Sequence, residues 1–492
     1  MPSQCLRSGR AALLADLKVP GMPSSGTGVS GIQDRRTDGP RRQRLLEVIL
    51  GLLVLARLGF AALVYARPDL ALANDSDRYV PIANSILAGR AYAWSTQHPG
   101  ELLNTIGYPL FLAGVFAGFG REPGDVALAQ LLATGALAVL MYAALGRRLG
   151  PTAGFAAAAV VVIDPLTILW SMTVLTEAVF AVALGMGAVL LASWSHSRNT
   201  PTLVLAGLLC AVACLVKPFA LLIVALWTAG ILVFPHGKGG AIRAQPSAGV
   251  RPALMFLLPA VVLIAPWFVR NGLLWECPTL SSVDRVTMRD YVAAKVLAEA
   301  EHVELAAVQS RLQDADPGVC PRLATQYWRI ILDNPGTYLR LHAAGTLPVL
   351  VATNFDRWLQ YVGTEYTLPD LWRPYMDGGW NRLIAVMGDE LRLHPGAVGL
   401  LLALTAFQVL LYAVAVMGAV AALRNYPAAD KWCAVILTLT ILILVLTPGQ
   451  GGHERFRVPV QPLLAILTAY AVARMRARTP RVSTAPPPSE AA

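Results

Sequence analysis

The chain has 492 residues, of which 55% are hydrophobic and only 14% are charged. An ordinary soluble domain is about 45–50% apolar and about 25% charged, so this composition excludes a conventional soluble protein and indicates a membrane protein. The formal net charge is +10, but the basic residues gather in short segments beside apolar runs. That pattern reports membrane topology and does not indicate nucleic acid as a partner.

The N-terminal residues 1–44 are rich in Pro, Gly, Ser and Arg and contain no apolar stretch long enough for a cleavable signal. We expect a disordered, basic cytoplasmic tail. The run 45–66 carries few charges and is long enough to cross a hydrocarbon core of about 30 Å. Because arginines precede this run, the positive-inside tendency places residues 67–104 on the extracytoplasmic side.

This first outer loop contains two carboxylates, Asp75 and Asp77. After them, apolar side chains recur at helical spacing: Tyr79, Ala83, Ile86 and Leu87. The spacing predicts a short amphipathic helix on the membrane surface, with Pro81 in its first turn. The two acids then lie at or just before a helix N-terminus. One interpretation is that an acid caps the helix, and the other is that it performs chemistry outside the bilayer.

Nine further apolar runs follow: 126–146, 152–170, 174–194, 201–216, 219–234, 253–269, 396–423, 432–447 and 459–474. The stretch 202–234 is too long for one span, since a helix rises about 1.5 Å per residue, so Lys217-Pro218 marks a break. Two shorter apolar segments, 105–120 and 338–353, are interpreted as half-inserted or interfacial. The sequence therefore predicts ten spans with both termini cytoplasmic, and a disordered tail over 475–492.

Two more outer loops are expected, over 270–337 and 448–458, and the polar stretch 354–395 joins the same face. The 270–337 loop contains a predicted amphipathic helix from Tyr291 to Leu312. It also contains Cys277 and Cys320, and no other cysteine shares it. Because thiols tend to pair on an oxidising side, we expect a disulfide between them. The six cysteines show none of the paired spacings typical of zinc or haem sites.

The first outer loop reads Asp75-Ser76-x-Arg78-Tyr79, followed later by Gly107-Tyr108-Pro109-Leu110. This pattern resembles the first outer loop of the GT-C glycosyltransferases. These polyprenyl-phosphate-sugar-dependent enzymes include protein O-mannosyltransferases and the lipid A aminoarabinose transferase. Other pieces match in order across residues 45–474: Asp164-Pro165, Thr176-Glu177, Lys217-Pro218, Pro266 to Asn271, Asn334-Pro335 and Glu454 to Pro459.

The resemblance implies an all-α integral membrane protein, a GT-C-type bundle of about 10–13 helices whose extracytoplasmic loops contain short helices. It also implies that Asp75 is the general base or the carboxylate that orients the acceptor. A sugar on a phosphate has a good leaving group, so one carboxylate near the acceptor hydroxyl suffices. Asp77 is a second candidate, although relatives place their second acid directly after the first. Glu177 is either solvated at the interface or a further acid facing the cavity.

The lipid phosphate that leaves needs cations at the membrane boundary. The candidate donor-phosphate ligands are Arg78, Lys217, Arg270, Arg455 and Arg457. Arginine suits phosphate because its planar fork binds two oxygens at once, but arginine at a span end is also an ordinary snorkelling residue. Charges cluster between two apolar helices at residues 453–457, which favours binding. The candidate substrate contacts are Tyr79, Tyr108, His453 and Glu454.

The resemblance therefore implies an inverting hexosyl- or pentosyltransferase of a bacterial inner membrane. It would take a sugar from a polyprenyl-phosphate donor and pass it to a hydroxyl of a lipid, glycan or protein acceptor on the extracytoplasmic face. No cofactor is expected. A metal held by acidic residues occurs in oligosaccharyltransferase relatives, but the histidines here have no ligand spacing, and none is expected. Neither a phosphate-cradling loop nor a dinucleotide fingerprint is visible.

Two alternatives remain. A flippase or transporter of polyprenyl-linked glycans also needs a basic, lipid-accessible cavity, but it should place charges in mid-helix along a central pathway. No internal repeat of the kind found in transporters is evident. A non-catalytic scaffold would keep the bundle without needing both the carboxylates and the cations.

Overall fold

The computed structural model describes residues 39–73, 75–90, 92, 102–234, 246–316, 318, 320, 324–364 and 372–478. All regular elements within these ranges are helical, so the predicted all-α fold is confirmed. Helix α2 (Pro40–Leu58) begins inside the segment interpreted as a tail, and α22 (Gln461–Arg478) extends past residue 474. The remainder of both predicted tails lies outside the described residues.

Seven helices in the described part of the chain are long and apolar enough to cross a membrane. They are α2 continued by α3 (Ala61–Ala66), α6 (Pro123–Leu149), α9 (Glu177–Ser197), α12 (Pro246–Trp275), α20 (Pro395–Asn425), α21 (Ala428–Leu446) and α22 with the preceding 3-10 segment η5 (Glu454–Val460). An eighth span results if α7 (Pro151–Ile163) and α8 (Pro165–Ser171), bent by 51° at Asp164, count as one.

The prediction of ten spans is wrong by this measure. Helices α10 (Thr200–Val216) and α11 (Ala220–Leu232) are apolar, but they have only 17 and 13 residues. The predicted break between them is confirmed, because Lys217 is extended and α11 starts after Pro218. A proline disfavours helical geometry in the residue before it, which explains why α10 stops there.

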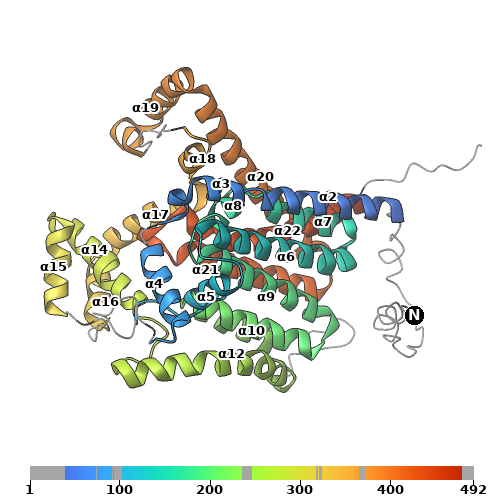
Figure 1. Cartoon of the computed structure of the whole chain (residues 1–492), viewed down its shortest axis with the longest axis horizontal. Coiled ribbons are helices and arrows are strands. Elements are labelled where there is room, and N and C mark those ends of the chain that lie inside the picture. Colours follow the sequence, from blue (N-terminus) through green and yellow to red (C-terminus); the bar gives the residue numbers. More distant parts are fainter. Residues whose placement is uncertain are drawn as a thin grey trace, which may run out of the picture. The chain divides into compact units, whose positions relative to one another are not determined.

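The bundle packs closely because small residues let helices approach. Helix α10 lies between α9 and α12, and α20 lies beside α22 (Figure 1). A Cβ on Gly207 would overlap the carbonyl of Phe256, and one on Gly418 would overlap that of Leu467. Both glycines therefore allow backbone contact between helices, as small residues commonly do in membranes.

Two short elements follow the first span: η2 (Pro68–Ala71) and α4 (Ser76–Leu87). The predicted short helix is confirmed, but Pro81 lies well inside α4 and not in its first turn. Proline removes one helical hydrogen bond, here to the carbonyl of Asp77. Asp77 is exposed, so this lost bond falls in a turn open to solvent. Helix α5 (Gly107–Gly118) follows and packs against α4.

A second group of short elements follows α12: α13 (Val283–Val286), the π-helix η3 (Thr287–Ala293), α14 (Ala294–Glu301), α15 (Leu305–Ala315), α16 (Ala324–Asp333), α17 (Pro335–Val351), α18 (Phe355–Tyr361) and α19 (Trp372–Leu393). The single amphipathic helix predicted from Tyr291 to Leu312 is wrong. His302 adopts a left-handed φ of 55°, which ends α14 before α15 begins. Cys277 and Cys320 form the expected disulfide.

Candidate active site

Four charged side chains from four distant segments form one chain of ion pairs. Arg455 Nη1 donates to Asp75 Oδ2 at 3.1 Å, and Arg455 Nε lies 3.8 Å from Glu177 Oε1. Lys217 Nζ donates to the same Glu177 oxygen at 2.9 Å. The structure thus brings together two predicted acids and two predicted cations, and their formal charges cancel.

Asp75 occupies the position directly before α4, yet its side chain makes no capping hydrogen bond. Its backbone is already helical (φ −72°, ψ −23°), and its carboxylate is directed to Arg455. The interpretation of Asp75 as a helix cap is therefore wrong. With its side chain 41% exposed, the carboxylate is accessible to a substrate.

The buried hydroxyl of Ser76 fixes the position of Asp75. Ser76 Oγ donates to the carbonyl of Val174 at 2.8 Å and accepts from the backbone N–H of Ala73 at 3.0 Å. The N–H of Val174 in turn donates to the carbonyl of Ala71 at 2.9 Å. These bonds hold the first loop against the segment that leads into Glu177. Sequence reasoning missed this role, because a serine between two acids gives no sign of the partner it finds in the fold.

Glu177 is the first residue of α9, and only 2% of its side chain is exposed. The interpretation of Glu177 as a solvated interfacial carboxylate is therefore wrong. Its partner Lys217 is held at the end of α10, where Thr105 Oγ1 donates to the carbonyl of Val216 at 3.1 Å. Gly107 also lies against the α10 backbone, so a side chain there would displace the end of that helix. The pair Glu177–Lys217 is thus built into the packing of α5, α9 and α10.

Arg455 lies in η5 beside an aromatic ring that both cations share. Lys217 Nζ is 5.1 Å and Arg455 Cζ is 5.2 Å from the centroid of the Phe456 ring, within cation–π range. His453 Nδ1 accepts from the backbone N–H of Arg455 at 3.3 Å and lies 3.0 Å from Glu454 Oε2. Residues 453–456 therefore act as one unit that presents Arg455 to the two acids.

Two tyrosines, Tyr79 and Tyr108, lie near the Asp75 and Glu177 carboxylates. The rings of Tyr79 and Tyr108 meet edge to face at 5.1 Å. Burial, reinforced by the nearby Glu177 and Asp75 carboxylates, raises the pKa of Tyr79, so its hydroxyl stays protonated. Tyr108 is fully buried, and its hydroxyl donates to Gln130 Oε1 at 3.4 Å. A substrate cannot reach Tyr108 in this arrangement, so its predicted substrate contact is wrong, and it supports Tyr79 instead.

Arg457 does not join this cluster, although it follows Arg455 by two residues. Its side chain is buried, and its two terminal nitrogens donate to the carbonyls of Val349 at 2.9 Å and Ala352 at 2.7 Å. These carbonyls lie at the C-terminal end of α17, where helices leave acceptors unpaired. The prediction that Arg457 binds the donor phosphate is therefore wrong, because its fork is engaged by the backbone.

The other predicted cations lie elsewhere. Arg270 Nη1 donates to Asn271 Oδ1 at 2.6 Å, and its guanidinium lies 4.4 Å from the centroid of the Trp267 ring. Arg78 and Asp77 are exposed on α4. Neither Arg78 nor Asp77 has a described contact with the Asp75–Arg455–Glu177–Lys217 cluster.

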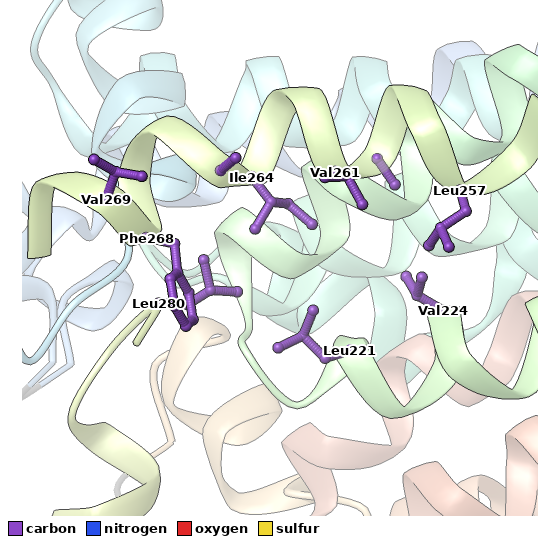
Figure 2. A pocket seen from close by; sticks show the side chains of 10 residues that line it. Leu221, Val224, Leu257, Val261, Ile264, Phe268, Val269 and Leu280 are labelled. Carbon is purple, nitrogen blue, oxygen red and sulfur yellow. The ribbon is translucent and has the colours of Figure 1, made fainter. Parts of the chain in front are cut away.

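An apolar groove opens between α11 and α12 (Figure 2). Its volume is about 330 Å³, and all its lining residues are apolar: Leu221, Val224, Leu257, Ala260, Val261, Ile264, Ala265, Phe268, Val269 and Leu280. Leu221 follows Lys217 by four residues, and α11 begins directly after the Lys217-Pro218 break. The groove thus runs along the helix that starts at the charged cluster.

The cluster combines the groups that a transfer from a phosphate needs. Asp75 is an accessible carboxylate that can accept a proton, and Lys217 and Arg455 can bind phosphate oxygens. Both cations also lie within cation–π range of the Phe456 ring. Across the residues described, no group of three or more His, Cys, Asp or Glu side chains has the arrangement of a metal site.

Residues 98–268 match the family model of dolichyl-phosphate-mannose-protein mannosyltransferases. This segment includes Glu177 and Lys217, and over it the resemblance to GT-C glycosyltransferases is confirmed. No curated protein matches the sequence.

Among solved structures, an oligosaccharyltransferase, AglB from Archaeoglobus fulgidus in complex with an inhibitory peptide and a dolichol-phosphate, is 12% identical with a TM-score of 0.46. The match covers 86% of this chain and 50% of that one, so this chain spans about half its length. ArnT from Cupriavidus metallidurans, bound to undecaprenyl phosphate, is 14% identical with a TM-score of 0.35, over 88% of this chain and 77% of that one.

Proposed function

We propose that this GT-C-type membrane protein is a glycosyltransferase that moves a sugar from a polyprenyl-phosphate carrier to an acceptor hydroxyl. The observation that carries the proposal is the cluster of Asp75, Arg455, Glu177 and Lys217. It places an accessible carboxylate beside two cations, and Lys217 precedes by four residues Leu221, which lines the apolar groove between α11 and α12.

In this mechanism Asp75 accepts the proton of the acceptor hydroxyl as the hydroxyl oxygen attacks the anomeric carbon. The bond between that carbon and the phosphate oxygen breaks, and the carrier leaves as polyprenyl phosphate. Lys217 and Arg455 stabilise the negative charge that develops on the leaving phosphate. One displacement of this kind inverts the configuration at the anomeric carbon.

The carrier chain has a suitable place in the α11–α12 groove. Polyprenyl is purely hydrocarbon beyond its phosphate, and the groove presents only apolar side chains. A chain in this groove would carry its phosphate to the start of α11, where Lys217 lies. An apolar pocket with a few polar groups at one end is the usual form of a site for such a ligand.

The charge balance of the resting cluster implies that the donor must rearrange it. Arg455 and Lys217 are both paired with carboxylates, so an incoming phosphate competes with Asp75 and Glu177 for them. Arg455 is the easier cation to recruit, because its contact with Asp75 is partly exposed while the Glu177–Lys217 pair is buried. Drawing Arg455 toward the phosphate would free Asp75 to accept a proton.

The finer assignments belong to the same proposal. The charged residues 448–458 and the first loop would face the extracytoplasmic side, because the basic segments between other spans are expected inside. The membrane would be a bacterial inner membrane. The acceptor would be a lipid, glycan or protein hydroxyl, and the sugar a hexose or pentose.

A direct test uses the purified protein in lipid nanodiscs with radiolabelled polyprenyl-phosphate mannose, scored for release of polyprenyl phosphate. We expect turnover by the wild type and its loss in Asp75→Asn. Asp77→Asn is the matched control, since Asp77 is an exposed carboxylate two residues away without a described contact to the cluster. Tight binding of bare polyprenyl phosphate without turnover of any polyprenyl-phosphate sugar would favour a carrier transporter instead.

A further inference from the structure

Three side chains form a strip that begins next to Arg455. They are His453 directly before η5, Trp170 in α8 and Arg357 in α18. The rings of His453 and Trp170 meet edge to face at 5.8 Å, and the Arg357 guanidinium lies 5.5 Å from the centroid of the Trp170 ring. The strip adjoins Arg455, because His453 accepts the hydrogen bond from the Arg455 backbone.

Arg357 is also tied to the loop that carries the proposed base. Its Nη2 donates to the carbonyl of Leu70, five residues before Asp75. Contact with the Trp170 ring and the bond to this carbonyl restrain the guanidinium, which also faces the Tyr361 hydroxyl. A guanidinium carries five N–H groups, so it has further donors besides those directed to Leu70 and Tyr361.

The strip is accessible at its two ends and closed in its middle. The side chain of His453 is 49% exposed, and Arg357 is half-buried. Trp170 is only 3% exposed, and its indole N–H has no hydrogen-bond partner within the described ranges. Burial raises the pKa of the neighbouring Tyr361 to about 12, an effect that Arg357 opposes, so this hydroxyl remains neutral.

We propose that Arg357, held beside the Trp170 ring, and His453 form the subsite for the sugar ring of the donor. This assignment rests on the proposed function, which puts the phosphate at Lys217 and Arg455 and the acceptor hydroxyl at Asp75. The sugar must then lie beside Arg455, and the strip is the adjacent polar wall. A neutral sugar offers neighbouring hydroxyl oxygens, and the planar fork of Arg357 can donate to two of them at once.

The test compares two ligands with the full-length protein in nanodiscs: polyprenyl-phosphate mannose and bare polyprenyl phosphate. We expect Arg357→Gln to weaken binding of the sugar-bearing donor by about 10- to 100-fold, the range for loss of a charged hydrogen bond. Binding of bare polyprenyl phosphate should be unchanged. Arg340→Gln is the matched control, because Arg340 pairs with Glu299 at an exposed position of α17.

Arg357→Lys keeps the charge and part of the packing on Trp170, so it tests the assignment even if Arg357→Gln fails to fold. Arg357→Lys should bind the sugar-bearing donor more weakly than the wild type does and should bind bare polyprenyl phosphate equally well. Equal losses for both ligands would assign Arg357 to the scaffold, and no loss for either would reduce its role to packing on Trp170. A wild-type protein that binds neither ligand would overturn the proposed function itself, whereas bare-carrier binding that depends on Arg455 would retain it.

Discussion

Arg455 and Asp75 are separated by 380 residues in the sequence and joined by a hydrogen bond of 3.1 Å. The contact links the start of the last candidate span to the loop after the first. It also couples the two proposed halves of the reaction, because Arg455, the proposed ligand of the leaving phosphate, is hydrogen-bonded to Asp75, the proposed base for the acceptor. Donor binding and activation of the base would then be one event.

Replacing Asp75 by Asn should reduce turnover by about 10²–10⁴-fold, the usual contribution of a general base. Asn keeps the size of the side chain but cannot accept the proton. The measurement is the rate of polyprenyl phosphate release at equal protein level, with Asp77→Asn as the control. If Asp75→Asn stays within a few-fold of the wild type, the base must be sought at another carboxylate.

Arg455 and Arg457 should behave differently when each is replaced by Lys. Arg455→Lys should lower donor affinity because the paired N–H geometry is lost, while the melting temperature changes little. Arg457→Lys should lower stability by about 1–3 kcal/mol, because the carbonyls of Val349 and Ala352 lose buried donors. Donor titration and thermal unfolding of both variants separate the two roles. If Arg457→Lys lowered donor affinity and Arg455→Lys lowered only stability, Arg457 would be the phosphate ligand.

Breaking the Glu177–Lys217 pair should lower the free energy of unfolding, because both side chains are largely buried. Glu177→Gln leaves Lys217 without its charge partner, and removing one member of a buried pair typically costs about 3–5 kcal/mol. The double variant Glu177→Gln, Lys217→Met should regain much of this stability but not donor binding. Thermal unfolding of the single and double variants gives the coupling between the two sites. If the losses of stability of the two single variants add up to that of the double variant, the interaction between Glu177 and Lys217 contributes nothing to stability.

The position of Arg455 should also depend on a glycine contact behind it. A Cβ on Gly452 would overlap the carbonyl of Gly345 in α17, whereas a Cβ on Gly451 would meet no atom within 4 Å. Gly452→Ala should therefore shift the 452–455 segment and reduce turnover, while Gly451→Ala should not. Both variants are compared by activity and melting temperature. Equal activity of the two would mean that the segment adapts without moving Arg455.

The disulfide should stabilise the region between its two cysteines. Cys277 and Cys320 are 43 residues apart, and closing a loop of this length contributes roughly 4 kcal/mol in the chain-entropy model. Cys277→Ser with Cys320→Ser should make residues 283–316 more sensitive to limited proteolysis under non-reducing conditions. A reductant should have the same effect on the wild type and none on the double variant. Equal protease resistance of all samples would contradict this role.

The sequence predicted the features that depend on local chemistry. The apolar runs predicted the long helices, and Pro218 predicted the break after α10. The expected oxidising environment of the outer loop predicted the disulfide between Cys277 and Cys320. Ten spans were predicted, but the described part of the chain has seven or eight long apolar helices, because the apolar runs 201–216 and 219–234 form helices of only 17 and 13 residues.

The site was only partly predictable, because its contacts join distant segments. Arg455 and Arg457 look equivalent in the sequence, yet one is directed to Asp75 and the other to backbone carbonyls. The roles of Ser76 and Arg357 depend on the carbonyls of Val174 and Leu70, which no local pattern reveals. Such partners are set by the packing of helices and loops, not by propensity.

The order of the four cluster residues along the chain also bears on biogenesis. Asp75, Glu177 and Lys217 are synthesised early, and Glu177 can meet Lys217 once α9 and α10 have packed. Arg455 lies at the start of the final span, so we expect it to reach Asp75 only after α22 has been translated and inserted. Chains stalled before this helix would contain most of the bundle and still lack the Arg455 contact. Partly inserted protein would therefore be unable to consume the carrier-linked sugar.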